Sequence, residues 1–158
     1  MLEGIFRSQE LELATAEFEN ARTAVKDFIG AESAREIIFT SGATHGLNLA
    51  AFSFGEAFVR AGDEILVDED SHHSNIIPWR MMCERKGAVL RHFDVSEDIS
   101  RFLTPATRLV AVSHISNVLG IVNPVEEIVR ICHSAGCLVL VDGAQGIVHI
   151  HPDVRKIG

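Results

Sequence analysis

Apolar residues near the start of the chain recur at spacings of three and four. The series runs from Leu11 to Phe28, and Gly30 follows it. Apolar residues at these spacings line one face of an α-helix. Glycine is the commonest residue just after a helix ends. The pattern therefore predicts an N-terminal helix within residues 1–30.

Short apolar runs then alternate with segments of helical periodicity. The runs predict buried strands at residues 36–40, 63–67, 88–93, 108–113 and 137–142. The helical patterns cover residues 47–54, 73–86 and 124–135. Strands joined through helices need crossover connections, which place helices on both faces of a parallel sheet. The sequence thus predicts an α/β fold over residues 36–158, with three α/β/α layers around a mostly parallel sheet.

Composition narrows the class of protein. A chain of 158 residues fits one domain, since domains average roughly 150 residues. Hydrophobic residues make up 47% and charged residues 23%, enough to bury a core and unlike a disordered chain. The net charge of −8, without a basic run, argues against nucleic acid as a partner.

The sequence also argues against secretion and membrane insertion. No apolar stretch reaches the ~20 residues of a membrane span, and residues 1–4 do not resemble a signal peptide. The three cysteines are an odd number without CxxC spacing. We expect them to be reduced core residues in a cytoplasmic protein.

Polar clusters follow four of the predicted strands. In open α/β sheets, ligands bind outside the carboxyl ends of the strands, so these clusters are the candidates for chemistry. They lie at residues 41–45, 70–75, 114–117 and 142–145.

The first cluster, residues 41–44, places small residues and a hydroxyl just before a helix. Free backbone N–H groups at a helix start favour a phosphate. The alternative is a tight turn with Thr44 as the helix N-cap. The cluster is not a Walker A loop, because no Gly-Lys-Ser/Thr follows it.

The last cluster begins with Asp142, a carboxylate at the end of an apolar strand. Burying a carboxylate is costly without a cation or hydrogen-bond donors, so Asp142 predicts a protonated ring nitrogen, a metal or an arginine as partner. The alternative is an N-cap. Gln145 either adds a second ligand contact or belongs to a capping box.

The middle clusters contain histidines and an asparagine. His72 and His73 are candidates for metal ligation, an aromatic platform, acid–base chemistry or plain polar surface. Neighbouring residues do not share a helix face, so we expect no joint metal site. Periodicity does not decide whether His114 or Asn117 faces the cleft.

Five motifs, taken in order, resemble the class V, fold-type-I enzymes that use pyridoxal 5′-phosphate. The likeness is greatest to the SUF-type cysteine desulfurase and selenocysteine lyase group. The motifs cover residues 37–44 (Ile-Ile-Phe-Thr-Ser-Gly-Ala-Thr), 62–65, 72–79 (His-His-Ser-Asn-Ile-Ile-Pro-Trp), 113–120 (Ser-His-Ile-Ser-Asn-Val-Leu-Gly) and 141–145 (Val-Asp-Gly-Ala-Gln).

The resemblance implies a role for seven residues. Thr44, with the backbone around Ala43, would hold the cofactor phosphate, and His72 would stack on the pyridine ring. Asp142 would pair with the pyridinium nitrogen and keep it protonated. Asn117 and Gln145 would lie near the ring's 3-oxygen and the substrate, and Ala144 would pack under the ring. His72 and Asn117 are the residues expected to take part in catalysis, and no metal is expected.

The resemblance also implies what residues 1–158 lack. In the family a lysine on a Ser-Gly-His-Lys segment forms the Schiff base, and neither Lys26, Lys86 nor Lys156 lies in such a segment. The persulfide-forming cysteine belongs to a later domain. We therefore expect residues 1–158 to be a partial cofactor-binding large domain without the small C-terminal domain, to bind the cofactor weakly and to be inactive alone.

The activity that the resemblance implies is conversion of cysteine to alanine with formation of an enzyme persulfide. The sulfur would pass to an acceptor protein for iron–sulfur cluster assembly, and the enzyme would be a homodimer acting on cysteine or selenocysteine. Another class V reaction (selenocysteine lyase, kynureninase-like, epimerase or aminotransferase) is the first alternative. A non-catalytic binding or dimerisation module is the second. A nucleotide-binding Rossmann domain is disfavoured, because no G-x-G-x-x-G follows the first predicted strand.

Overall fold

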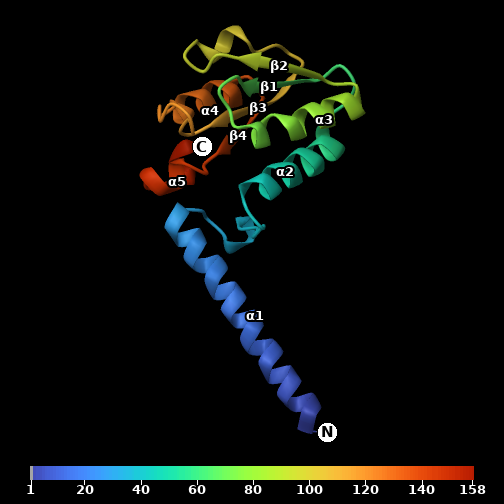
Figure 1. The fold of residues 1–158 in the computed structure, drawn as a ribbon, viewed down its shortest axis with the longest axis vertical. Coiled ribbons are helices and arrows are strands. Elements are labelled where there is room, and N and C mark those ends of the chain that lie inside the picture. The colour runs from blue at the N-terminus through green and yellow to red at the C-terminus, as the bar shows by residue number, and fades with distance from the viewer. Residues whose placement is uncertain (1) are drawn as a thin grey trace. The chain divides into compact units, whose positions relative to one another are not determined.

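A computed structural model describes residues 2–158, with side chains from Glu10 onward. The chain separates into two compact units (Figure 1). One unit runs up to Phe39 and includes Pro152–Lys156, and the other comprises Thr40–His151 and Ile157–Gly158.

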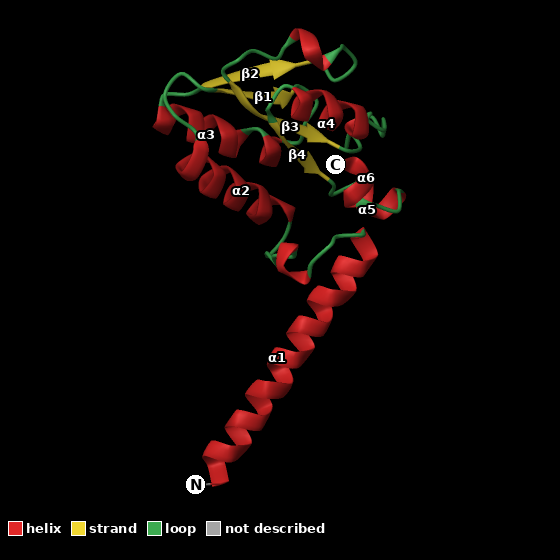
Figure 2. Cartoon of the chain, turned by 180° about the vertical axis from the view of Figure 1, so that it is seen from behind, coloured by secondary structure: helices red, strands yellow, loops and turns green. Residues whose placement is uncertain are grey.

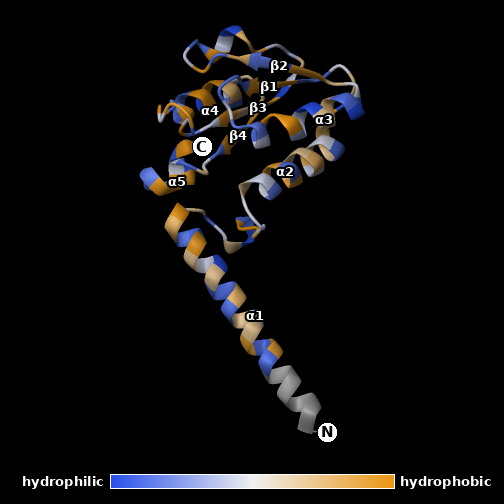
Figure 3. Cartoon of the chain, viewed as in Figure 1, coloured by the Kyte–Doolittle hydropathy of each residue, from blue (hydrophilic) through white to orange (hydrophobic). Residues whose placement is uncertain are grey.

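The first unit contains the predicted N-terminal helix, α1 (Leu2–Ile29). The helix ends before Gly30, which adopts the left-handed conformation with φ 71°. The Ala31 amide then donates a hydrogen bond of 3.0 Å to the Lys26 carbonyl. Hydrophobic and hydrophilic residues are interspersed along α1 from residue 10 onward (Figure 3). The helix is thus confirmed, although Leu11 on its apolar side is 70% exposed.

The predicted strand at residues 36–40 is wrong. A capping box winds the chain into a 3₁₀ turn, η1 (Ala34–Glu36), in which the Glu36 carboxylate accepts from the Ser33 amide at 2.8 Å. Residues 37–40 have no regular structure, and no described strand pairs with them. Ile38 is 72% exposed. An apolar run predicts a strand only if a neighbour satisfies its backbone, and the local cap competes for this segment.

The second unit contains a four-stranded, fully parallel sheet (Figure 2). Its strands are β1 (Glu64–Asp68), β2 (Val89–Phe93), β3 (Thr107–Ser113) and β4 (Leu138–Asp142). The order across the sheet is β2-β1-β3-β4, with β1 and β3 in the middle. The four strands confirm the other four predicted runs and the parallel arrangement.

Helices cover both faces of this sheet. The helices α2 (Ala43–Phe58) and α3 (Ile77–Lys86) pack on one face, and α4 (Val125–Ser134) packs on the other (Figure 1). Side chains of a strand alternate between faces, so Ala111 packs toward α2 and α3, and Val110 toward α4. The predicted three-layer α/β/α fold is confirmed.

The remaining elements are short and lie in the connections. They are η2 (His73–Asn75), η3 (Ile99–Arg101), α5 (Gly146–His149) and α6 (Val154–Ile157). None of the helices described reaches the length and apolar character needed to cross a bilayer.

The cysteines are core residues, as expected. Cys83, Cys132 and Cys137 carry free thiols, and each is no more than 2% exposed. Burial raises the pKa of Cys83 to about 11. A thiol with so high a pKa is almost entirely protonated at neutral pH, so Cys83 is a poor nucleophile.

Candidate functional site

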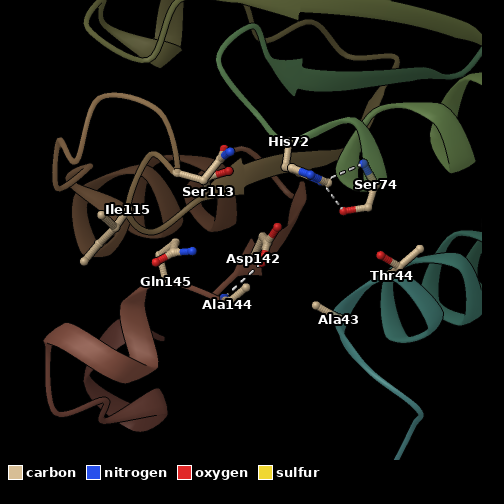
Figure 4. A pocket seen from close by; sticks show the side chains of 10 residues that line it. Ala43, Thr44, His72, Ser74, Ser113, Ile115, Asp142, Ala144 and Gln145 are labelled. Carbon is tan, nitrogen blue, oxygen red and sulfur yellow. Dashed lines mark hydrogen bonds between the residues drawn. The ribbon is translucent and has the colours of Figure 1, made fainter.

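All seven residues predicted to form a site line one pocket of the second unit. It lies at the carboxyl ends of the strands, beside the segments that follow β3 and β4 and the first turn of α2 (Figure 4). The predicted residues in its lining are Ala43, Thr44, His72, Asn117, Asp142, Ala144 and Gln145. Residues spread over a hundred positions of sequence therefore meet at one edge of the sheet, although their individual roles stay predictions.

Ala43 and Thr44 form the first turn of α2 at one side of the pocket. The N-cap is Gly42, with φ 144°, a conformation that favours glycine. The alternative interpretation of Thr44 as the N-cap is therefore wrong. No described side chain caps this helix, so the first-turn amides are left for a ligand, and the positive end of the helix dipole suits an anion.

His72 follows β1 and faces the pocket with its ring held in place (Figure 4). Its Nδ1 accepts a hydrogen bond from the Ser74 amide at 3.1 Å and lies 2.7 Å from the Ser74 hydroxyl. The ring of His73 is nearly perpendicular to it, at an interplanar angle of 73° and a centroid distance of 6.3 Å. Among the described residues, no group of three or more His, Cys, Asp or Glu side chains is placed to hold a metal ion.

Asp142 ends β4 and is half-buried at the pocket wall. Its Oδ1 accepts a hydrogen bond from the Ala144 amide at 3.0 Å. No arginine or lysine among the described residues forms an ion pair with it. The carboxylate therefore retains acceptor capacity for a donor that enters the pocket.

Neither capping alternative at this end of the pocket holds. Helix α5 has Gln145 as its N-cap, and the Gln145 side chain makes no cap hydrogen bond. Asp142 lies three residues before that cap and receives the Ala144 amide instead. The interpretations of Asp142 as an N-cap and of Gln145 as part of a capping box are thus wrong.

The loop after β3 decides between His114 and Asn117. Asn117 lines the pocket, whereas His114 does not. His114 instead packs so closely on Gly146 that a Cβ at Gly146 would lie 2.6 Å from its Nδ1. An antiparallel bridge between Ile115 and Val122 closes the loop.

Three further residues complete the pocket: Ser74, Ser113 and Ile115. Sequence reasoning assigned no role to them, although Ser74 and Ile115 lie within two of the candidate clusters. Ser113 had a signal, because it is a hydroxyl at the end of an apolar strand and opens the motif at residues 113–120. Ser74 and Ile115 differ from ordinary loop and core residues only in their position.

A family model for class-V aminotransferases matches residues 7–158. The chain belongs to the class-V aminotransferase family. A cysteine desulfurase from Enterobacter sp. (strain 638) is 48% identical over 151 residues. A probable cysteine desulfurase from Halalkalibacterium halodurans is 44% identical over 153 residues.

Solved structures agree with this class-V assignment. The cysteine desulfurase CsdA from Escherichia coli matches with a TM-score of 0.86 and 32% identity over 94% of this chain and 39% of CsdA. The apo cysteine desulfurase from Thermococcus onnurineus NA1 matches with a TM-score of 0.83 and 36% identity over 92% of this chain and 38% of that protein. A mutant of C-DES, with a TM-score of 0.79 and 26% identity over 91% of this chain and 41% of C-DES, carries glycine covalently linked to its PLP cofactor.

The class-V chain spans well under half the length of its relatives. The alignments to the Enterobacter and Halalkalibacterium proteins cover 91% and 92% of this chain, but 37% and 38% of the relatives.

Proposed function

We propose that residues 1–158 form the cofactor-holding part of a pyridoxal 5′-phosphate-dependent cysteine desulfurase. The observation that carries the proposal is the pocket itself, which gathers the seven residues that the family resemblance selects. The cysteine desulfurase names of relatives at 44% to 48% identity support the activity.

The donor set of the pocket fits this cofactor. One side offers first-turn amides and the Thr44 hydroxyl, which suit a phosphate dianion. Another side offers the Asp142 carboxylate, which suits a protonated ring nitrogen. His72, in the same lining, provides an aromatic ring that Ser74 holds in place. An anion site, a cation site and a flat aromatic group match the three parts of a phosphorylated pyridine.

Each residue has a distinct role in this proposal. Thr44 binds the phosphate, His72 stacks on the ring, and Asp142 holds the proton on the ring nitrogen. Asn117 and Gln145 orient the 3-oxygen and the substrate, and Ala144 packs under the ring. When bound, the cofactor supplies an electron-withdrawing ring that weakens bonds at the substrate's α-carbon.

Several finer statements belong to the same proposal and rest on the family resemblance. They are cysteine as substrate, an acceptor protein that receives the sulfur for iron–sulfur cluster assembly, a homodimeric enzyme and a cytoplasmic location. SspA, a structural neighbour at 25% identity, has been solved in complex with cysteine, which supports the substrate. Residues 1–158 are proposed to be a partial large domain.

Residues 1–158 alone are expected to bind the cofactor weakly and not to release alanine from cysteine. The lining of the pocket contains no lysine among the described residues, so covalent anchoring and the acid–base role of that lysine are missing. Alanine release by this polypeptide would contradict the expectation.

The pocket assignment is tested with pyridoxine 5′-phosphate, which has the ring and the phosphate but no aldehyde and needs no lysine. Equilibrium dialysis measures its dissociation constant for residues 1–158 and for the variants Asp142→Asn and Thr44→Val. Each variant keeps the shape of the side chain and removes one polar contact. We expect Asp142→Asn to weaken binding at least about tenfold, as for a lost hydrogen bond to a charged group.

The matched control is Glu127→Gln, which makes the same carboxylate-to-amide change on α4, where the Glu127 side chain is 65% exposed. It should bind like the unchanged chain. If the unchanged chain does not bind the analogue, or if both pocket variants bind as well as it does, the cofactor assignment is refuted.

A further inference from the structure

A chain of buried hydroxyl and carboxyl groups lies directly behind one wall of the pocket. Ser113, at the end of β3, lines the pocket and is 5% exposed. Its hydroxyl oxygen lies 3.2 Å from that of Ser71, which in turn lies 3.3 Å from Oδ2 of Asp68. Asp68 is 1% exposed, so its carboxyl group is removed from water. None of these groups is used in the roles proposed above.

Asp68 is the acceptor end of this chain. Its Oδ1 accepts from the Asp70 amide at 3.1 Å, and its Oδ2 accepts from the Ser71 hydroxyl. Burial and the nearby Asp70 carboxylate raise the pKa of Asp68, and the hydrogen bonds that it receives only partly oppose that rise. Both of its carboxyl oxygens nevertheless act as acceptors, one for the Asp70 amide and one for the Ser71 hydroxyl.

The direction of the two hydroxyl groups follows from that acceptor. A carboxylate only accepts, so the Ser71 hydroxyl donates to Asp68. The Ser71 oxygen then accepts from the Ser113 hydroxyl, and the Ser113 oxygen is left with its lone pairs free. The Asn123 side chain, donating to the Ser113 carbonyl at 2.8 Å, holds the backbone of Ser113 in place.

The Ser113 oxygen lies on the strand next to the proposed cation site. Ser113 and Asp142 are partners in the β3–β4 register, and both line the pocket (Figure 4). A serine with its proton turned away presents the negative end of its dipole. Together with Asp142, it makes this wall an acceptor for a cationic ring.

We propose that Ser113 is a specificity-determining residue that favours a pyridine ring with a protonated nitrogen, and that Ser71 and Asp68 are positioning residues that orient its hydroxyl. The inference rests on the proposed function, because it concerns the same pocket and the same ligand. It predicts that the direction of a hydrogen-bond chain outside the pocket controls the protonation state of what is bound inside it.

The test uses residues 1–158 and pyridoxine 5′-phosphate at neutral pH. Equilibrium dialysis gives the affinity. The absorption spectrum of the bound analogue separates the ring with a protonated nitrogen from the ring with a neutral one. A change that only loosened the fold would weaken binding without moving this spectrum.

Three variants break or reverse the chain of hydrogen bonds. Ser113→Ala removes the acceptor, and Ser71→Ala removes its orientation. Asp68→Asn is nearly isosteric and can donate through its amide to Ser71, which turns the Ser113 proton toward the pocket. Each is expected to weaken binding about fivefold, the equivalent of one ordinary hydrogen bond, and to shift the bound spectrum toward the neutral ring.

Two controls separate orientation from folding. Ser113→Thr keeps the hydroxyl and is the conservative rescue: it should restore the bound spectrum that Ser113→Ala loses, even if its added methyl group changes the affinity. Ser134→Ala removes an exposed hydroxyl on α4 that donates to the Arg130 carbonyl, and it should behave like the unchanged chain. Thermal unfolding identifies any variant that has lost the fold. If one has, the bound spectra of Ser113→Ala and Ser113→Thr are compared to decide whether the hydroxyl controls the protonation state.

The outcomes also separate this inference from the cofactor assignment. If Asp142→Asn weakens binding but Ser113→Ala and Asp68→Asn leave the bound spectrum unchanged, the role of Ser113 is overturned and the proposed function stands. If the unchanged chain does not bind the analogue, both fail.

Discussion

The contact between α2 and α3 makes a sharp prediction about Gly55. This glycine lies in the interior of α2, and a Cβ there would lie 2.3 Å from Cγ and 2.8 Å from Sδ of Met82. Met82 belongs to the core and is 1% exposed. Replacing Gly55 with alanine therefore forces a buried side chain of α3 to move.

Two opposing effects determine the magnitude. Alanine in place of glycine inside a helix gains about 1 kcal/mol. Overpacking a core costs about 1–3 kcal/mol, and an overlap as close as 2.3 Å belongs at the upper part of that range. We expect Gly55→Ala to lower the free energy of unfolding by about 1–2 kcal/mol.

Gly46 provides the matched control, since it lies in the same helix. A Cβ at Gly46 would meet only the Thr40 hydroxyl oxygen, at 3.5 Å, which is an ordinary contact. Gly46→Ala should therefore raise the free energy of unfolding by up to about 1 kcal/mol. The same substitution in one helix is thus predicted to have opposite signs.

Urea unfolding followed by tryptophan fluorescence is the assay. Trp79 is the single tryptophan of the chain, is fully buried in α3 and reports on this interface. Combining Gly55→Ala with Met82→Ala tests the cause, because the added methyl group then enters the space that Met82 vacates and should stabilise that variant. A Gly55→Ala chain as stable as the unchanged one would refute the reasoning.

Two further predictions concern titratable groups of the second unit. The Thr104 hydroxyl, at 2.7 Å, and the Arg91 guanidinium hold the pKa of Glu64 below its usual value of 4.5 despite burial. Glu64 therefore stabilises the fold above pH 4.5. This contribution disappears as the pH falls through the lowered pKa. Glu64→Gln should cost about 1 kcal/mol at neutral pH and flatten the acid limb of a urea-unfolding pH series; an unchanged limb would count against it. The three cysteines should resist alkylation by iodoacetamide in the folded chain and react with it in denaturant, as measured by mass spectrometry. Labelling of Cys83 as fast as that of free cysteine would contradict its burial and its pKa of about 11.

The sequence alone determined the class of fold and selected seven residues that line one pocket. Four of the five predicted strands exist, because continuous apolar runs bounded by polar residues suit strands buried on both faces. The polar residues after those strands were recognisable because a parallel sheet brings its carboxyl ends to one edge. That rule predicted that residues as distant as His72 and Asp142 would meet, and both line the pocket.

Only the tertiary structure decided how local alternatives were resolved. The segment at residues 36–40 resembled a strand, yet a strand is made by its neighbours, and the capping box of Ser33 and Glu36 competes locally. The sequence allowed Thr44 as an N-cap and the Gln145 side chain as part of a capping box. In the structure Gly42 is the N-cap of α2, and Gln145 is the N-cap of α5 without a side-chain hydrogen bond.

The link from Ser113 through Ser71 to Asp68 was also beyond sequence reasoning. Ser71 and Ser113 are 42 residues apart, and their hydroxyl groups meet only because β1 and β3 are neighbours in the sheet. Periodicity determines which residues are buried, since burial depends on the face that a residue occupies. Which buried polar groups meet depends on strand order and register, and these are set by the packing of the whole domain.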